Sequence, residues 1–447
     1  MKFAFIENRY KTIFWSSLST ELRSYGHEVV WLVQNPIFSP SGEPIKSIYI
    51  APFPRKCELV SLSLKDGLDR AYKADRHSNY FSGDNRHYHH YQTIIEKWLD
   101  SEKPDVVIGE STLFHELIVV ETCRKKNILY LHPSMPGYPG GRFSIYAYDK
   151  KEPLGISGDV PNDAECLAMA EAICKHERIP EYMIPPSGTE PERKHPLPRS
   201  FQDRLMILRG YLAGERYNTP SPLKKWLLDR QVKRRLKIWQ QITEHKAQTN
   251  MGHRIALYPL QLQPEANIDV WGQEFRNQAQ LVSQLADALP DGWLLNVKAN
   301  PKSKYEVSDE LLDILRYHPK VSPVSLTKSM ASVFSAVDLV CTVTGTVAVE
   351  CVLSRKPLVQ FGPGVVEPGP GCVQLGIANE VSDVIRSIES NSYKLATDVD
   401  RIHLVRKLYA TTFHGKVSDP ANHPAVMAEE NVRIVARTII EVAKRCK

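Results

Sequence analysis

Short apolar segments that end in polar loops recur along the whole chain, and helix-length amphipathic segments separate them. In the first half, strands are predicted at residues 3–6, 27–33, 106–108 and 128–131, with helices at 11–25 and in the stretch that ends at Cys123. In the second half, the same alternation runs through strands at 255–260, 293–297, 339–343 and 357–361. Strands that alternate with helices form parallel sheets covered on both faces, so the sequence predicts an α/β fold.

The 447 residues exceed the size of one ordinary core and predict two Rossmann-like α/β domains that face a cleft. Prolines between 180 and 198 mark an irregular connection between the two alternating patterns. The expected parts are an N-terminal α/β domain at 1–185, a proline-rich connection with a basic helix at 186–250, a C-terminal α/β domain at 251–398, and C-terminal helices at 399–447 that could pack back on the first domain.

The composition is that of a globular protein, with 42% hydrophobic and 24% charged residues, and the formal charge of +6 is small for this length. This balance suits a small anionic partner and does not predict a nucleic-acid-binding protein. No apolar run reaches the roughly 18–20 residues that span a bilayer, no signal peptide precedes the first strand, and the cysteines form no C-x-x-C pair. A cytoplasmic protein with reduced thiols is the simplest interpretation.

Two groups of potential metal ligands have simpler explanations. His87, His89 and His90 lie close together, but no acidic or cysteine residue stands at ligand spacing beside them. Asp398 and Asp400 form a D-x-D pattern that follows no clear strand, so we expect these residues to cap the next helix. The sequence therefore predicts no metal site and no other required cofactor.

Polar side chains follow two of the strands predicted in the second half. Gln263 and Glu265 come after strand 255–260, and the segment after strand 293–297 contains Lys298, Asn300 and Lys302. Ligands of α/β proteins bind at the carboxyl ends of the strands, so these groups could contact a substrate. The lysines could neutralise a phosphate and the amides could donate hydrogen bonds to it, although solvated lysines and a helix-capping loop produce the same pattern.

A third loop, after strand 339–343, places Thr344, Gly345 and Thr346 before a predicted helix. Backbone N–H groups at the start of a helix attract anions, and glycine lets the backbone approach a phosphate closely. Glu350, one turn into the helix, could accept hydrogen bonds from a ribose. The loop matches neither the P-loop nor the G-x-G-x-x-G pattern, so neither an ATPase nor a dehydrogenase is indicated.

Together these segments resemble the capsule polysaccharide synthesis family, whose better-understood members are retaining β-Kdo transferases with the GT-B fold. The resemblance covers residues 255–365 and rests on Gln263-Pro264-Glu265, the segment Lys298 to Pro301, Thr344-Gly345-Thr346 followed by Glu350, Lys356-Pro357 and Phe361-Gly362. It implies a GT-B-like glycosyltransferase that takes part in the synthesis of bacterial capsule or lipopolysaccharide and needs no metal ion.

The resemblance also assigns roles to the two domains. The second domain would bind a nucleotide sugar through Gln263, Lys298, Asn300, Lys302, Thr344, Gly345, Thr346 and Glu350, and the first would bind an oligosaccharide or lipid-linked acceptor. CMP-Kdo is the first choice of donor. Family members that use CMP-activated acidic sugars usually carry His-Pro where this chain has Asn300-Pro301. A UDP-, GDP- or other activated sugar is therefore the alternative.

Carboxylates at strand ends are the candidate catalytic groups. Glu110, after strand 106–108, could act as a base or as a nucleophile, with His115 as its partner, and Glu265 is a second candidate. Arg9, His132 and Arg142 lie in or beside polar loops of the first half and are the candidates for acceptor contacts. Each of these residues could instead have a purely structural role.

Residues 223–242 predict a basic amphipathic helix with Leu228, Val232, Leu236, Trp239 and Ile242 on one face. Such a helix could rest on the inner face of the cytoplasmic membrane, where a lipid-linked acceptor would be found, or it could pack on the protein itself. Two other functions fit the same fold, a sugar-nucleotide epimerase and a non-catalytic scaffold that binds a glycan or a nucleotide sugar.

Overall fold

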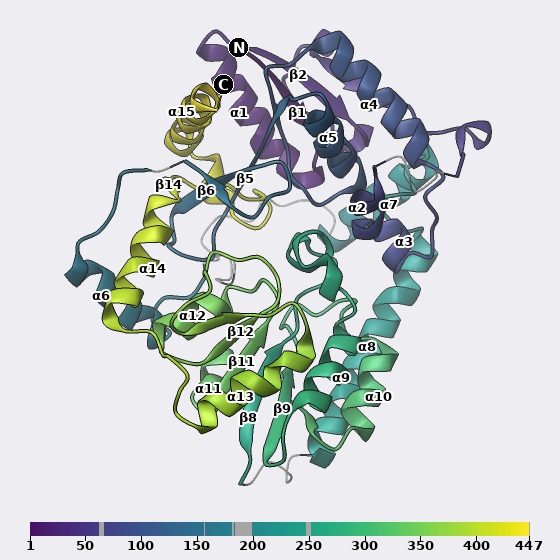
Figure 1. The fold of residues 1–447 in the computed structure, drawn as a ribbon. Coiled ribbons are helices and arrows are strands. Elements are labelled where there is room, and N and C mark those ends of the chain that lie inside the picture. The colour runs from purple at the N-terminus through teal and green to yellow at the C-terminus, as the bar shows by residue number, and fades with distance from the viewer. Residues whose placement is uncertain (62–66, 156, 181–182, 184–198, 247–251, 447) are drawn as a thin grey trace. The chain divides into compact units, whose positions relative to one another are not determined.

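The computed structural model describes residues 1–61, 67–155, 157–180, 183, 199–246 and 252–446 (Figure 1). The chain divides into two compact units, each with its own sheet. Unit 1 comprises residues 1–159, 180–225 and 409–447, and unit 2 comprises residues 160–179 and 226–408. Each unit therefore combines segments that are distant in the sequence.

Unit 1 contains an eight-stranded sheet with a parallel centre and an antiparallel edge. Its order is β14-β6-β5-β4-β1-β2-β3, and β7 pairs with β6. The five strands from β3 to β5 are parallel, whereas β6 runs antiparallel to each of its partners. The strands are β1 (Lys2–Ile6), β2 (Glu28–Val33), β3 (Ile48–Ile50), β4 (Val106–Ile108), β5 (Leu129–Ser134), β6 (Arg142–Ala147), β7 (Pro153–Leu154) and β14 (Phe413–His414).

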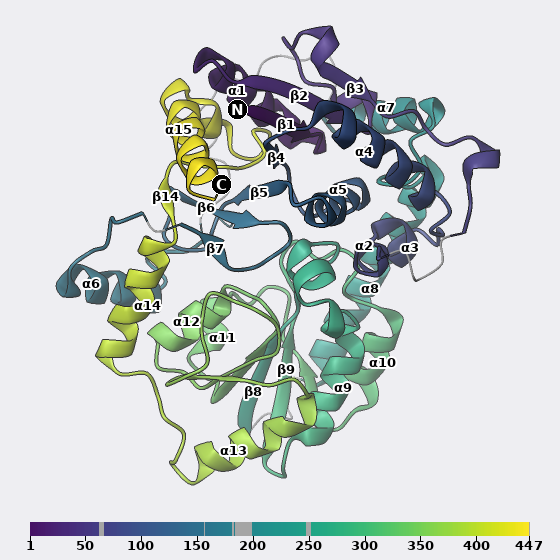
Figure 2. The ribbon, with the colours of Figure 1, turned by 45° about the horizontal axis from the view of Figure 1, so that its top comes forward.

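Both faces of this sheet are buried, as the apolar strand sequences require. Phe3 and Phe5 of β1 join a core with the helices α1 and α15, while the intervening Ala4 is buried on the other face. Figures 1 and 2 show α15 beside α1, at opposite ends of the chain. The helices of unit 1 are α1 (Thr12–Ser24), α2 (Asp69–Ala74), α3 (Arg76–Tyr80), α4 (Tyr88–Glu102), α5 (Phe114–Lys125), α7 (Arg199–Ala213) and α15 (Glu429–Arg445).

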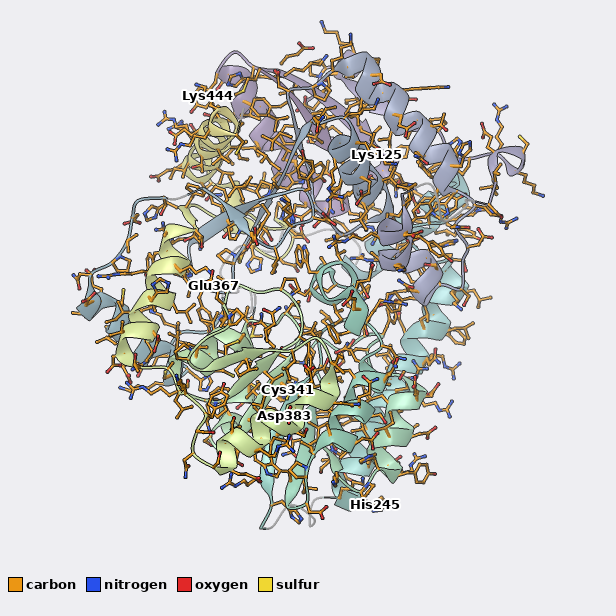
Figure 3. The ribbon with its side chains drawn as sticks, in the orientation of Figure 1. Lys125, His245, Cys341, Glu367, Asp383 and Lys444 are labelled. Carbon is orange, nitrogen blue, oxygen red and sulfur yellow. The ribbon has the colours of Figure 1, made fainter. Side chains whose placement is uncertain are left out.

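Unit 2 contains six parallel strands in the order β10-β9-β8-β11-β12-β13. Counted along the unit, this is the order 3-2-1-4-5-6 of the Rossmann fold. Cys341, labelled in Figure 3, lies in the middle of this sheet and is buried. The strands are β8 (Arg254–Pro259), β9 (Trp293–Lys298), β10 (Val321–Pro323), β11 (Leu339–Thr342), β12 (Leu358–Gln360) and β13 (Cys372–Gln374).

The helices of unit 2 include the predicted basic helix, whose apolar face packs on the protein. Trp239 and Ile242 of α8 are buried in the core of unit 2, and the Trp239 indole donates to the Val324 carbonyl at 2.9 Å. Helices α8 and α14 both cross the division between the units. The helices are α6 (Asp163–Cys174), α8 (Pro222–Lys246), α9 (Gln278–Ala288), α10 (Asp309–Tyr317), α11 (Met330–Phe334), α12 (Val347–Leu353), α13 (Val381–Glu389) and α14 (Asp398–Ala410).

The two sheets confirm the predicted α/β class with two Rossmann-like domains. Between β8 and β9, a short 3-10 turn precedes α9, because the Asn277 side chain accepts from the Gln280 N–H and starts a new helix there. The compact units also differ from the predicted domains. Residues 160–179 and 226–246 belong with unit 2. Residues 409–447 belong with unit 1, where α15 packs on α1, in agreement with the expectation that the C-terminal helices could pack back on the first domain.

Candidate functional site

Each sheet has a switch point at which the strand order reverses. In unit 1 it lies between β1 and β4, and in unit 2 between β8 and β11. The connections from two such strands turn away in opposite directions, so their carboxyl ends leave room for a ligand between the loops. The residues after these strands therefore form the candidate site of each unit.

In unit 1, Glu110 follows β4 and lies in a buried cluster with Lys11, Ser111 and His132. One Glu110 carboxylate oxygen accepts from the Lys11 ammonium, and the other lies 3.0 Å from His132 Nε2. On the opposite side of the imidazole, Ser111 Oγ lies 3.1 Å from Nδ1. The structure thus brings together Glu110 and His132, both of which were predicted site residues. Lys11 and Ser111 extend this series of polar contacts and were not predicted from the sequence.

Burial shifts the proton equilibria in this cluster. Loss of hydration, reinforced by the positive charge of Lys11, lowers the pKa of His132 to about 3, so the ring is neutral at neutral pH. A neutral ring can donate from Nε2 to Glu110 and accept the Ser111 hydroxyl at Nδ1. Burial also lowers the pKa of Lys11 to about 7. Glu110 therefore lies between a neutral imidazole and an ammonium group that can exchange a proton near neutral pH, and such shifted pKa values are typical of catalytic sites.

The backbone at Glu110 is fixed from two sides. Glu116 accepts from the Glu110 N–H at 3.2 Å and from the Asn8 amide at 2.8 Å, which ties the loops after β1 and β4 together. Tyr130 donates its hydroxyl to the Glu110 carbonyl. A Cβ at Gly109 would lie 2.2 Å from that hydroxyl, so only glycine fits before Glu110.

His115 does not partner Glu110, and this prediction was wrong. His115 Nε2 lies 2.8 Å from the carbonyl oxygen of Glu7, and Nδ1 lies 3.2 Å from the Asn218 amide nitrogen. The ring is buried in this separate network. His132, which is distant from Glu110 in the sequence but lies on the neighbouring strand, takes the expected place.

Arg9 and Arg142 connect parts of unit 1. Arg9 donates to the Asn218 carbonyl and to the Thr219 hydroxyl. Arg142 is 3% exposed and donates to Thr412 Oγ1 and to the Thr412 carbonyl, both at 2.8 Å, and to Asp159 at 2.6 Å. These bonds give both arginines a structural role, and their predicted contacts with an acceptor stay a prediction.

In unit 2, Lys298 is the last residue of β9 and has an unusual environment. The residue is only 6% exposed, yet no acceptor among the described residues contacts its ammonium group. Burial lowers its pKa, and no carboxylate offsets this effect. A buried ammonium without a partner costs stability, and such sites are retained where an anion binds. Lys298 is therefore the strongest single indication of a ligand in this unit.

The switch point of unit 2 is formed by Gln261, Thr342 and Gly345. Gln261 Nε2 donates to Thr342 Oγ1 at 3.2 Å, which connects the ends of β8 and β11. A Cβ at Gly345 would lie 2.9 Å from Gln261 Nε2, so a larger residue in the loop after β11 would have to displace this amide. Gln261 and Thr342 were not among the predicted site residues, because their proximity depends on the strand order.

The remaining predicted donor-site residues differ in accessibility. The Asn300 side-chain oxygen accepts from the Lys302 N–H at 2.9 Å, which leaves the amide N–H groups available, and Lys302 is exposed. Thr344 donates its hydroxyl to the Asn267 carbonyl at 2.8 Å. Thr346 immediately precedes α12, and Glu350 is buried within that helix.

The Gln263-Pro264-Glu265 segment separates into a buried and an exposed part. The Gln263 side chain donates to Asp269 at 3.1 Å and to the Arg276 carbonyl at 3.2 Å, and it accepts from Gln278 at 3.0 Å. Its amide is therefore committed to holding the loop, which replaces the predicted contact with the donor. Glu265 is exposed.

Comparisons with known proteins add the following. No protein-family model and no curated protein match the chain. Similar solved structures include the β-Kdo 2,7 transferase of Thermosulfurimonas dismutans KpsC, with 9% identity over 100% of both chains and a TM-score of 0.39. The β-Kdo 2,4 transferase of the same KpsC has 14% identity over 76% of this chain and 88% of that chain, with a TM-score of 0.34. UDP-GlcNAc 2-epimerase of Methanocaldococcus jannaschii has 14% identity over 91% and 99%, with a TM-score of 0.29.

Two further findings concern membrane-spanning helices and metal-binding groups. Within the described ranges, no helix is both long and apolar enough to cross a bilayer. In the same part of the chain, no three His, Cys, Asp or Glu side chains are grouped as a metal-binding site requires. Asp398 and Asp400 lie in the first turn of α14, where Asp398 pairs with Arg355 and Arg401.

Proposed function

We propose that this chain is a glycosyltransferase that takes a sugar from a nucleotide donor bound at the switch point of unit 2. The observation that carries this proposal is Lys298, a residue only 6% exposed at the carboxyl edge of a Rossmann-ordered sheet, whose ammonium contacts no acceptor among the described residues. A donor phosphate would supply the missing negative charge. Gln261 and the Asn300 amide lie at the ends of the same strands and offer hydrogen-bond donors.

CMP-Kdo is the proposed donor, because the motifs around Lys298 resemble those of β-Kdo transferases. Asn300 stands where histidine is usual in that family, and an amide can donate to a phosphate but cannot carry its charge. UDP- and GDP-sugars are the alternatives. Lys298 provides the positive charge that a metal ion provides in other transferases, so we expect activity in the presence of a chelator such as EDTA.

Glu110 is the proposed catalytic group of unit 1. Its carboxylate is held between Lys11 and the neutral His132, so its orientation is fixed before any substrate arrives. Lys11 can take up or release a proton near neutral pH, and Glu110 can accept one from an acceptor hydroxyl group. Glu265 is the weaker candidate, because its side chain is exposed, whereas that of Glu110 lies in a buried cluster.

The acceptor is proposed to be a glycan, and the exposed face of α8 could bring the enzyme to a lipid-linked one. Leu223, Trp226 and Leu227 are exposed at the start of this helix, and exposed Arg230 and Arg234 continue the same stripe. Apolar residues followed by cations are typical of helices that bind anionic lipid surfaces. Binding to phosphatidylglycerol vesicles but not to phosphatidylcholine vesicles would support this role.

The test combines nucleotide binding with turnover. The protein is first heated with CMP, UDP, GDP or NAD, because a ligand of the folded state raises the stability by RT ln(1 + [L]/Kd). The sugar nucleotide that corresponds to the stabilising nucleotide is then incubated with and without a glycan acceptor. Nucleotide release that depends on the acceptor supports a transferase. Isomerised donor without any acceptor would indicate an epimerase, and binding without turnover would indicate a scaffold.

A further inference from the structure

A pocket of about 470 Å³ lies in unit 2, away from the switch point. Its walls come from the end of α6, from α11, from the turn after α12 and from the start of α14. Helix α12 begins at the carboxyl edge of the sheet and ends at this pocket. The pocket therefore belongs to the opposite edge of the sheet from Lys298 and is not part of the donor site.

Cationic side chains dominate the polar wall of this pocket. Arg355, Lys356 and Arg401 all line it, and Glu171 is the one carboxylate in the described lining. Lys356 donates to the backbone carbonyls of Ser335 and Val337, and no carboxylate of the described residues pairs with it. Asp398 pairs with Arg355 and Arg401, and Glu171 pairs with Arg401, so these five groups together leave one excess positive charge, which favours an anionic ligand.

Arg401 has an unsatisfied donor at this pocket. The residue is 5% exposed, and its two terminal nitrogens donate to Glu171 at 2.6 Å and to Asp398 at 2.8 Å. Its Nε is buried without a hydrogen-bond partner. A buried N–H group without an acceptor destabilises the fold, and an acceptor supplied by a ligand would relieve this effect.

The sulfur of Cys174 lies in the same wall. Its thiol donates to the Leu353 carbonyl at 3.1 Å, and it accepts from the Ser354 hydroxyl at 3.3 Å and from Arg401 Nη2 at 3.8 Å. The apolar part of the pocket includes Phe334 and Leu353. The arrangement combines an anion-binding wall, an apolar wall and a thiol that can report on occupancy.

We propose that this pocket is a second ligand site, which binds a small molecule with an oxyanion head group and an apolar body. The phosphate or carboxylate would accept from Arg401 Nε and Arg355, and the apolar body would lie against Phe334. The site is independent of the proposed transferase activity.

The experiment uses Cys174 as a built-in reporter. The intact protein is alkylated with iodoacetamide, and the labelling rate of each cysteine is followed by mass spectrometry with and without phenyl phosphate or benzoate. Sodium chloride at equal ionic strength serves as the reference, and the exposed Cys57 and Cys446 are internal controls. At a probe concentration about ten times Kd, labelling of Cys174 should slow about tenfold, because only the free site reacts.

Variants separate binding at the pocket from general effects. R401K keeps the charge but removes Nε–H, and R355Q removes the charge at a half-exposed position. Both should reduce the protection of Cys174 at least threefold, whereas R386Q, an exposed arginine paired with Asp383, should not. If R401K fails to fold, the protection of Cys174 in R355Q alone decides whether the pocket binds the probe.

The two probes distinguish a phosphate ligand from a carboxylate ligand, and protection by either supports the site. The proposal is overturned if neither probe protects Cys174 in the wild type. Protection that is equal in R355Q and the wild type, or that extends to Cys446, would also overturn it.

Discussion

Replacing Lys298 with methionine should change the stability of the free protein and its affinity for nucleotide in opposite directions. The wild-type ammonium is 6% exposed and has no acceptor among the described residues, so folding removes its hydration without compensation. Methionine has a similar length and carries no charge. We expect the free energy of unfolding of the free protein to rise by about 1 kcal/mol. This is the usual gain in stability when a residue that is retained for function is replaced by one that suits the fold better.

The loss in binding follows from the same environment. A hydrogen bond between two charged groups contributes about 1.5–3 kcal/mol when it is shielded from water. Loss of about 2 kcal/mol corresponds to a roughly thirtyfold increase in the Kd of the stabilising nucleotide. An exposed lysine would lose far less, because solvent screens its charge.

Urea unfolding of the free protein and titration calorimetry with the nucleotide measure the two effects separately. Lys394 is an exposed lysine of unit 2 outside the sheet edge, so K394M is the matched control and should change neither quantity. A K298M protein that binds nucleotide as tightly as the wild type would refute the assignment of Lys298. Lower stability of free K298M would refute the conclusion that its charge is uncompensated.

Three further predictions concern unit 1. E110Q should lower turnover at least about a hundredfold without changing nucleotide-induced stabilisation, and full activity would remove Glu110 from the mechanism. His132 has a lowered pKa in the fold, so protonation favours unfolding, and its contribution to stability is lost as the pH falls below about 6.5. Between about pH 7 and about pH 5.5 the wild type should lose about 1 kcal/mol more than H132Q in urea unfolding, and parallel pH profiles would contradict this. R142M should destabilise the protein by about 3 kcal/mol in thermal unfolding, whereas R433M, at an exposed ion pair, should change stability by less than about 1 kcal/mol, and equal effects would disprove the structural role of Arg142.

The alternation of apolar strands and helices was enough to predict the fold class and most strands near the switch points. Residues 3–6, 106–108, 255–260 and 293–297 all lie in strands within one or two residues of the predicted ends. Their apolar runs are buried on both faces, which is the pattern that identifies central parallel strands. Strands β7 and β14 were missed because two-residue strands at a sheet edge have no periodicity to detect.

Residues of the candidate site could be predicted only where they lie next to an apolar strand in the sequence. Glu110 and Lys298 directly follow or end apolar strands, and both lie at the expected edges of their sheets. Lys11 was missed because it precedes a helix and resembles any solvated lysine until β1 and β4 are known to be neighbours. Gln263 and Arg142 have the residue types of ligand contacts, but long-range partners such as Gln278 and Thr412 occupy them.

The position of α15 has a consequence for synthesis on the ribosome. Arg437 in α15 donates to the Tyr25 hydroxyl just after α1 at 3.0 Å, across 412 residues of sequence. At about 5–20 residues per second, translation delays this contact by roughly 20–80 s. During that time the apolar face of the first strands lacks its final cover, so the part of the chain that is made first is completed last. Nascent unit 1 therefore keeps this apolar face uncovered until α15 has been synthesised.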